Sequence, residues 1–387
     1  MKIKWIGFIV CILVCIGCSK AKEGGWKGSI ENENGIEVVF NPAIPMYSSR
    51  VVTFEEDLVI GQSDSSEESN LSSLLSFAVD GQENIYILDT KPLQVKVFDR
   101  ESEFLRSFGQ AGQGPGDLTV TGSIQITHEN EMMCVDDMKG EIKFFSTEGR
   151  FLRSLRCPSL RWTSHTTLMP TDRIYSLKLY PGSHEEQLIS LIPPYEEPKV
   201  VASRPSPRQF SLPLIWIRYA AMADNHLIWG ITSEYEFHII DDSGKTVRKI
   251  KKKHTTIPLS EEYRAEITQL APPGASKESY AKSIAQRLSP YFPAFDFIFT
   301  DEAGRLFVKT FETEKETGHN LVDVFDTRGR FLARTPLKVD HVVTGRWPNL
   351  YKIKNNHLYA PEHDKNGFPV LKRYEIILEK ESFTPRF

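Results

Sequence analysis

The chain has 387 residues, of which 40% are hydrophobic and 25% charged, and its formal net charge is −4. These proportions are typical of a folded globular protein and argue against collagen-like, wholly disordered and polytopic membrane classes. Because there is no basic excess, the charge balance also argues against nucleic acid as a partner. Aromatic residues make up 11% of the chain, with 23 Phe and 13 Tyr, which favours β-rich structure.

The first residues have the pattern of an export signal. Lys2 and Lys4 precede an apolar run from Trp5 to Gly17, which is too short to span a bilayer as a helix. The run ends in Cys15-Ile16-Gly17-Cys18-Ser19. A small residue followed by cysteine looks like the cleavage site of a lipoprotein, although Cys15 stands where such sites usually have Leu. An uncleaved anchor or an ordinary signal peptide is the alternative interpretation.

Lipidation of Cys18 would determine where the protein resides. We expect residues 1–17 to be a lipoprotein signal peptide and residues 18–50 to form a lipidated tether and N-terminal segment, polar from Ser19 to Asn34. Lipid on Cys18 then makes the membrane a partner without a spanning segment. Ser19, in place of an acidic residue after the cysteine, favours the outer membrane. The predicted location is extracytoplasmic, facing the periplasm.

Two cysteines remain after these assignments, Cys134 and Cys157. The compartment permits a disulfide, but two cysteines do not make a disulfide framework. Cys134 lies among apolar residues and is predicted to be a small buried hydrophobic side chain. The oxidation state of the pair stays open at this point.

The chain repeats itself with a period of 47 residues. Ile87-Leu88-Asp89 aligns with Cys134-Val135-Asp136, and Phe104-Leu105-Arg106-Ser107-Phe108 aligns with Phe151-Leu152-Arg153-Ser154-Leu155, without a gap. Each repeat holds four short β-branched or aromatic runs bounded by turn residues. Four strands in a period of about 40–50 residues are typical of one blade of a β-propeller.

Six blades are predicted in chain order. The first extends from Ser76 to Phe108, the second follows at one period, and a weaker third has three strands between Thr166 and Ile192. Blades four and five extend from Ala220 to Ile250 and from Phe295 to Thr335, and the last has three strands between Leu350 and Ile377.

An isolated strand near the N-terminus is predicted to complete the ring. Val51 to Ile60 would supply the fourth strand of the last blade, because an open ring would leave bare strand edges. Residues 51–381 are therefore expected to form a single all-β, six-bladed β-propeller. A helical insertion at 260–290, with helices from Ser260 to Leu270 and from Ser276 to Leu288, is predicted between blades four and five.

Several segments resemble a known family. They include Asp80-Gly81-x-x-Asn84-Ile85-Tyr86-Ile87-Leu88-Asp89, Val95-Lys96-Val97-Phe98-Asp99, Phe104 to Gly109, the glycine-rich stretch Gly109 to Gly116, and Val370-Leu371-Lys372-Arg373-Tyr374. From about Val51 to Glu379 the chain resembles bacterial six-bladed β-propeller lipoproteins related to the NHL-repeat proteins. The resemblance implies the fold and implies little about activity.

The ionisable and nucleophilic residues of the sequence do not form a recognisable catalytic motif. Strand-end aspartates such as Asp80, Asp99 and Asp326 are expected to stabilise turns. The ten histidines have no metal-ligand spacing, and Asp296 is the one carboxylate in the predicted innermost strands. The sequence favours a binding or protein-interaction module and predicts no cofactor. A metal-dependent hydrolase or lyase with its site in the central channel, holding calcium there, is the alternative.

Arginine and aromatic residues in the predicted inter-blade connections are the candidate contacts for an unidentified protein or small-molecule ligand. Such connections form the faces of a propeller, and these residue types are favoured in binding patches. Packing between blades is the competing interpretation. The candidates are Arg161, Trp162, Arg218, Tyr219, Arg346 and Trp347.

Overall fold

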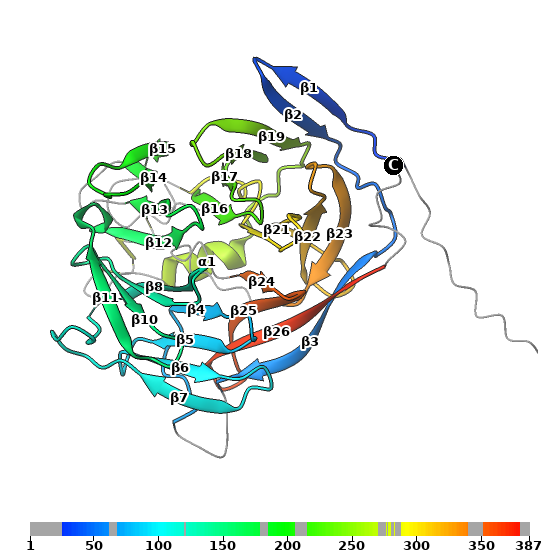
Figure 1. Ribbon diagram of the computed structural model, residues 1–387. Coiled ribbons are helices and arrows are strands. Elements are labelled where there is room, and N and C mark those ends of the chain that lie inside the picture. Colours follow the sequence, from blue (N-terminus) through cyan, green and yellow to red (C-terminus); the bar gives the residue numbers. More distant parts are fainter. Residues whose placement is uncertain are drawn as a thin grey trace, which may run out of the picture.

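A computed structural model of the chain describes residues 25–61, 68–119, 121–178, 185–205, 215–269, 276, 278–279, 282, 288–339 and 351–379. Six sheets, antiparallel except for one parallel strand pair in blade four, are arranged around a central axis (Figure 1). Blades one, two, three and five are four-stranded meanders in which the first strand lies innermost, and blades four and six each also contain N-terminal residues on their outer side. The predicted six-bladed, all-β architecture with a short helix is confirmed.

Blades one and two follow the 47-residue repeat. Blade one consists of β4 (Ser76–Val79), β5 (Ile85–Asp89), β6 (Gln94–Phe98) and β7 (Phe104–Phe108). Blade two consists of β8 (Thr121–Ile126), β9 (Met132–Asp136), β10 (Glu141–Phe145) and β11 (Phe151–Arg156), followed by the short 3-10 helix η1 (Pro158–Leu160). The middle strands β5 and β9 are buried along their whole length, which explains their continuous apolar sequences.

Blades three to five complete most of the ring. Blade three consists of β12 (Thr163–Leu168), β13 (Ile174–Lys178), β14 (Glu185–Leu191) and β15 (Lys199–Pro205). Blade four contains β16 (Ile217–Ala221), β17 (Leu227–Ile231), β18 (Glu236–Ile240) and β19 (Thr246–Lys252). Blade five consists of β20 (Phe297–Thr300), β21 (Leu306–Thr313), β22 (Asn320–Phe325) and β23 (Phe331–Leu337). Strand β15 lies beyond the three strands predicted for this blade, between Pro193 and Pro213, in a stretch rich in proline. As an outermost strand it tolerates proline.

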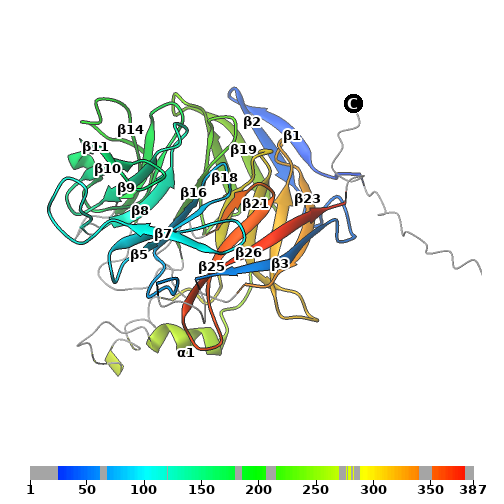
Figure 2. The same cartoon turned by 60° about the horizontal axis from the view of Figure 1, so that its bottom comes forward.

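Blade six joins the two ends of the propeller. Its strands are β24 (Lys352–Lys354), β25 (His357–His363), β26 (Pro369–Leu378) and β3 (Val52–Ile60). Strand β3 pairs antiparallel with β26, with Phe54 opposite Ile376 and Ile60 opposite Leu371. Figures 1 and 2 both place these strands side by side. The predicted closure of the ring by an N-terminal strand is therefore confirmed.

A hairpin that the sequence did not predict extends blade four. Strands β1 (Ser29–Glu33) and β2 (Ile36–Asn41) form the hairpin, and β2 pairs in parallel with β19, Val39 lying opposite Ile250. The side chains of β1 are exposed throughout, whereas Val38 and Val39 are fully buried. Part of the expected polar tether is thus the exposed edge strand of a six-stranded sheet.

Helix α1 (Glu261–Gln269) lies against one face of the ring, as Figure 2 shows. Ser260 caps it, since its hydroxyl accepts a hydrogen bond from the backbone N–H of Tyr263 at 3.1 Å. Tyr263 packs on Phe292, with ring centroids 4.9 Å apart. The predicted helix Ser276 to Leu288 falls largely outside the described residues. Within the described part of the chain, no helix has the length and apolar character required to cross a bilayer.

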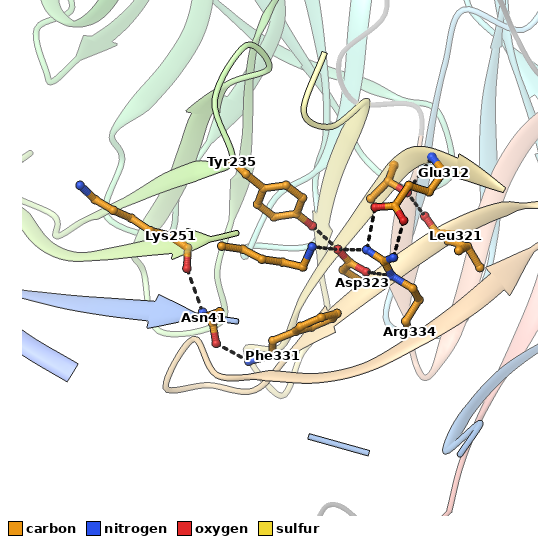
Figure 3. Close-up of polar contacts among 10 residues, drawn as sticks. Asn41, Tyr235, Lys251, Glu312, Leu321, Asp323, Phe331 and Arg334 are labelled. Atoms are coloured by element: carbon orange, nitrogen blue, oxygen red, sulfur yellow. Dashed lines mark hydrogen bonds and ion pairs between the residues drawn. The ribbon is translucent and has the colours of Figure 1, made fainter. Parts of the chain in front are cut away.

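A buried ion cluster holds blades four and five together (Figure 3). The carboxylate of Asp323, fully buried in β22, lies 3.2 Å from the amine of Lys252 and 2.6 Å from Nε of Arg334. Tyr235 donates a hydrogen bond to the same carboxylate at 2.5 Å. The neighbouring cations hold the pKa of Asp323 below its usual value despite burial. Nearby, Asn41 donates a hydrogen bond to the carbonyl oxygen of Gly329 at 2.8 Å, which attaches the hairpin to blade five.

Candidate functional site

The central channel contains a cavity of about 280 Å³. Residues of β4, β8, β12, β16, β20 and β24 line it, so every blade contributes its innermost strand. None of the described lining residues carries a carboxylate. The polar lining residues are Ser76, Ser123, Gln125, His165, Thr166, Thr167, Thr300, Tyr351, Lys352 and Lys354.

Several of these polar side chains connect neighbouring blades. The Gln125 amide accepts a hydrogen bond from the backbone N–H of Leu168 at 2.9 Å and donates one to the carbonyl oxygen of that residue at 2.7 Å. Ser76 accepts a hydrogen bond from the N–H of Ile124 at 3.1 Å, and Thr300 donates one to the carbonyl oxygen of Ala221 at 2.5 Å. These groups satisfy backbone atoms of the innermost strands, which have a free edge toward the channel.

Lys352 differs from the other lining residues because its ammonium group has no carboxylate partner among the described residues. Its amine donates a hydrogen bond to the carbonyl oxygen of Phe77 in blade one and lies 5.0 Å from the centroid of the Phe77 ring. No ion pair joins Lys352 to an acidic residue in the described part of the chain. Burial lowers the pKa of Lys352 to about 8.

Two other lysines show what a paired environment does. Lys309, which is 1% exposed, lies 2.6 Å from the carboxylate of Asp296, and this partner raises the pKa of Lys309 in spite of burial. Lys354, at the channel, pairs with Glu302 at 2.5 Å. Lys352 is therefore the channel cation whose charge the described protein leaves uncompensated.

Asp296 does not line the cavity. It precedes β20, and its carboxylate is committed to Lys309. Among the described residues there is no group of three or more His, Cys, Asp or Glu side chains placed to hold a metal ion. Cys134 and Cys157 are both buried free thiols.

The structure places some of the predicted contact residues in surface connections and others in the interior. Arg161 and Trp162 lie in the connection after η1, as expected, and Trp162 is 39% exposed. Arg218 and Tyr219, expected in a connection, instead lie within β16 with exposures of 2% and 0%. The difference arises because β16 begins at Ile217, three residues before the predicted strand. Cys18, Arg346 and Trp347 lie outside the described residues.

A pair of buried lysines at the repeat positions was not among the residues predicted to matter. Lys96 and Lys143, 4% exposed each, donate hydrogen bonds to the carbonyl oxygens of Asn70 and Asp117, respectively. The two lysines are 47 residues apart, and so are the two acceptors. Blades one and two therefore use the same contact to hold the segment that precedes their first strand. The signal was the lysine repeated within an otherwise apolar strand pattern.

The strand-end aspartates have the role expected of them. One oxygen of Asp80 accepts hydrogen bonds from the backbone N–H groups of Gln82 and Asn84, each at 2.8 Å. Asp326 does the same for Arg328 at 3.0 Å and Arg330 at 2.8 Å. Asx-type turns of this kind fix the hairpins between strands.

Comparison with known proteins agrees with this architecture. The sequence family described as DUF5128, 6-bladed beta-propeller, matches residues 64–180. The chain is a six-bladed β-propeller. No curated protein sequence matches it.

Similar solved structures share the fold at low sequence identity. A protein of Bacteroides fragilis described as exported is 14% identical, with a TM-score of 0.51 over 88% of this chain and 99% of its own. A DUF4221 protein of Bacteroides vulgatus is 13% identical, with a TM-score of 0.55 over 85% of this propeller and 99% of its own chain. A gluconolactonase of Xanthomonas campestris is 12% identical, with a TM-score of 0.44 over 79% and 87%. The likenesses to the two Bacteroides proteins concern the fold alone.

Proposed function

We propose that this propeller is a lipid-tethered, extracytoplasmic binding module whose central channel holds a small anionic ligand. The observation that carries the proposal is the amine of Lys352, which faces a cavity without a carboxylate among its described lining residues. Buried cations in proteins are normally paired. A ligand carboxylate, phosphate or sulfate would supply the missing partner.

The size and composition of the cavity favour a small molecule over a peptide or a metal ion. Its volume of about 280 Å³ is just below the range of about 300 to 1,000 Å³ that is usual for ligand pockets, so it suits a small ligand. Ala78, Ile298 and Phe299 provide apolar walls, while Ser123 and Thr167 provide hydroxyl groups. A divalent cation would need several oxygen ligands and would be repelled by Lys352.

The tether rests on sequence features and on one structural relative. Cys18 follows a short apolar run and a small residue, as in lipoprotein precursors. The similar Bacteroides fragilis protein is described as exported, which supports a location outside the cytoplasm. In this proposal lipid on Cys18 holds the propeller at the outer membrane, facing the periplasm.

Calorimetric titration with inorganic phosphate and with succinate, and with glucose as the uncharged control, tests the channel site. We expect an anion to bind the wild-type protein and Lys352→Met to weaken it by about 10- to 100-fold, since a hydrogen bond to a charged group contributes about 1.5–3 kcal/mol. Lys354→Met, whose ammonium already has Glu302 as its partner, is the matched control and should retain binding. Equal affinity of the Lys352→Met and wild-type proteins, or no binding of either anion, would refute the proposal.

A further inference from the structure

Arg218 is an arginine in the interior of the ring. It is 2% exposed and belongs to the largest fully buried side chains of the described chain. Its Nε donates a hydrogen bond to the carbonyl oxygen of Asp296 at 2.9 Å, and its guanidinium carbon lies 4.2 Å from the centroid of the Phe297 ring. Its Nη1 is buried and has no hydrogen-bond partner among the described residues. Burial lowers the pKa of Arg218 to about 10.

A second buried guanidinium lies close by. Arg204, 4% exposed at the end of β15, has its guanidinium carbon 5.3 Å from the centroid of the Trp216 ring, and that of Arg218 lies 5.8 Å from the same ring. Nε of Arg204 pairs with Glu186 at 2.5 Å. Its Nη2 is likewise buried, with no hydrogen-bond partner in the part of the chain that the structure describes.

The charges around these two arginines do not balance. Glu186 is committed to Arg204, and its Oε2 also accepts a hydrogen bond from the N–H of Ile217 at 3.1 Å. Asp296, the other acidic neighbour of Arg218, is paired with Lys309. Among the described residues the cluster therefore keeps one positive charge in excess, together with two buried donors that nothing satisfies. Unsatisfied buried donors are rare in native proteins because each costs about 1–3 kcal/mol.

We propose that Arg204 and Arg218 form a second, buried anion site, which takes one carboxylate or one phosphate group. Guanidinium groups present paired N–H donors that match the oxygens of both anions. An anion there would satisfy Nη1 of Arg218 and Nη2 of Arg204 and would neutralise the excess charge. The indole of Trp216 would form an adjoining wall.

This site is separate from the Lys352 amine. Arg218 lies two residues before Ala220 on β16, and alternate residues of a strand point to the same side. Ala220 lines the channel cavity, whereas Arg218 is not among the residues that line it. The second site therefore lies beyond the cavity, toward the end of the ring at which β16 begins. Its existence does not depend on the function proposed for Lys352.

Titration of the purified propeller with inorganic phosphate and, separately, with acetate, at constant ionic strength and with unfolding temperature as the readout, tests the site. We expect one of the two anions to raise the unfolding temperature of the wild-type and Lys352→Met proteins, and Arg204→Gln to reduce the apparent affinity by at least about 10-fold. Which anion acts distinguishes a phosphate site from a carboxylate site. Arg153→Gln is the matched control, because Arg153 stacks 4.1 Å from the Phe144 ring but its side chain is 50% exposed and pairs with Glu131.

A second measurement keeps the test decisive if Arg204→Gln folds poorly. Crystals of the wild-type protein grown in the effective anion should show its density within hydrogen-bond distance of Nη1 of Arg218 and Nη2 of Arg204. Unchanged titration curves in Arg204→Gln, no response of the wild-type protein to either anion, or crystals without such density would overturn the proposal. Loss of the response in Lys352→Met alone would assign the anion to the channel amine and would also count against a second site.

Discussion

Lys352 in β24 donates a hydrogen bond to the carbonyl oxygen of Phe77 in β4, so a side chain of the last blade is bound to the backbone of the first. Gln125 makes the same kind of link from blade two to Leu168 of blade three, and Arg218 from blade four to Asp296 before blade five. The innermost strands have a free edge at the channel, and these side chains satisfy part of it. Lys352 and Arg218 do so with cations that have no acidic partner among the described residues.

Replacing Lys352 by Met should stabilise the protein at neutral pH. With the pKa lowered from 10.5 to about 8, burial of the ammonium costs about 3 kcal/mol. Loss of the hydrogen bond to the Phe77 carbonyl cancels about 1 kcal/mol of the stability gained by removing this buried charge. We expect a net gain of about 2 kcal/mol in the free energy of unfolding, measured by urea denaturation at pH 7.

The gain should shrink in alkali. Between pH 8 and 10.5 the folded protein has released the Lys352 proton while the unfolded chain still binds it, so wild-type stability rises with pH in this window. Lys309→Met is the matched control of opposite sign, because it leaves Asp296 without its ion pair and should destabilise. A Lys352→Met protein less stable than wild type at both pH 7 and pH 10 would contradict the prediction.

Deleting residues 50–61 should destabilise the whole propeller. The deletion exposes the edge of β26 and removes Val51, Val52 and Ile60, which are at most 1% exposed. Each such side chain contributes about 1.5–3 kcal/mol. Calorimetry should show a large loss of unfolding temperature, whereas removal of residues 25–33, whose strand β1 is exposed, should have a much smaller effect. A 50–61 deletion that melts like its parent is the contradictory result.

Asp323→Asn should cost about 3–5 kcal/mol, because the buried ammonium of Lys252 would lose its carboxylate partner, whereas Arg334 would be left with Glu312. Asp57→Asn, which breaks a partly exposed pair with Arg373, should cost less than about 1 kcal/mol. The lowered pKa of Asp323 means that its contribution is complete above pH 3.8 and disappears as the pH falls through the folded-state value. Wild-type stability should therefore fall more steeply than that of Asp323→Asn below about pH 4, as followed by acid titration. Parallel acid curves would show that Asp323 is not responsible.

Cys18→Ala should leave the precursor unprocessed or release the protein from the membrane, because lipid on Cys18 is the proposed attachment. Membrane fractionation and gel mobility measure this, with Cys15→Ala as the control that preserves the acceptor cysteine. Unchanged fractionation together with unchanged mobility of Cys18→Ala would exclude lipidation at this residue. Protease treatment of intact cells should leave the protein uncut if it faces the periplasm.

The sequence by itself determined the blades. The 47-residue repeat, the aspartates that begin turns and the apolar strand runs are local signals, and a strand's pattern of burial depends on its own residues. Closure by Val52–Ile60 also followed from the sequence, because the last predicted blade lacked a fourth strand and one N-terminal strand was unassigned, and pairing the two leaves no bare strand edge there. Helix α1 was predicted for the same local reasons, its cap and its apolar spacing.

Only the tertiary structure decided which charges lie inside the ring and which of them are paired. Lys309 and Lys352 look alike in the sequence, yet Lys309 meets Asp296 across neighbouring strands and Lys352 meets a backbone carbonyl of another blade. The hydrophobic pattern placed the start of this strand at Ala220, so Arg218 was expected in a surface connection. The strand in fact begins at Ile217 and contains Arg218. The parallel pairing of β2 with β19 joins residues about 210 positions apart. Such contacts depend on how the blades pack around the axis. They join residues far apart in the chain, so the local sequence around each residue does not predict them.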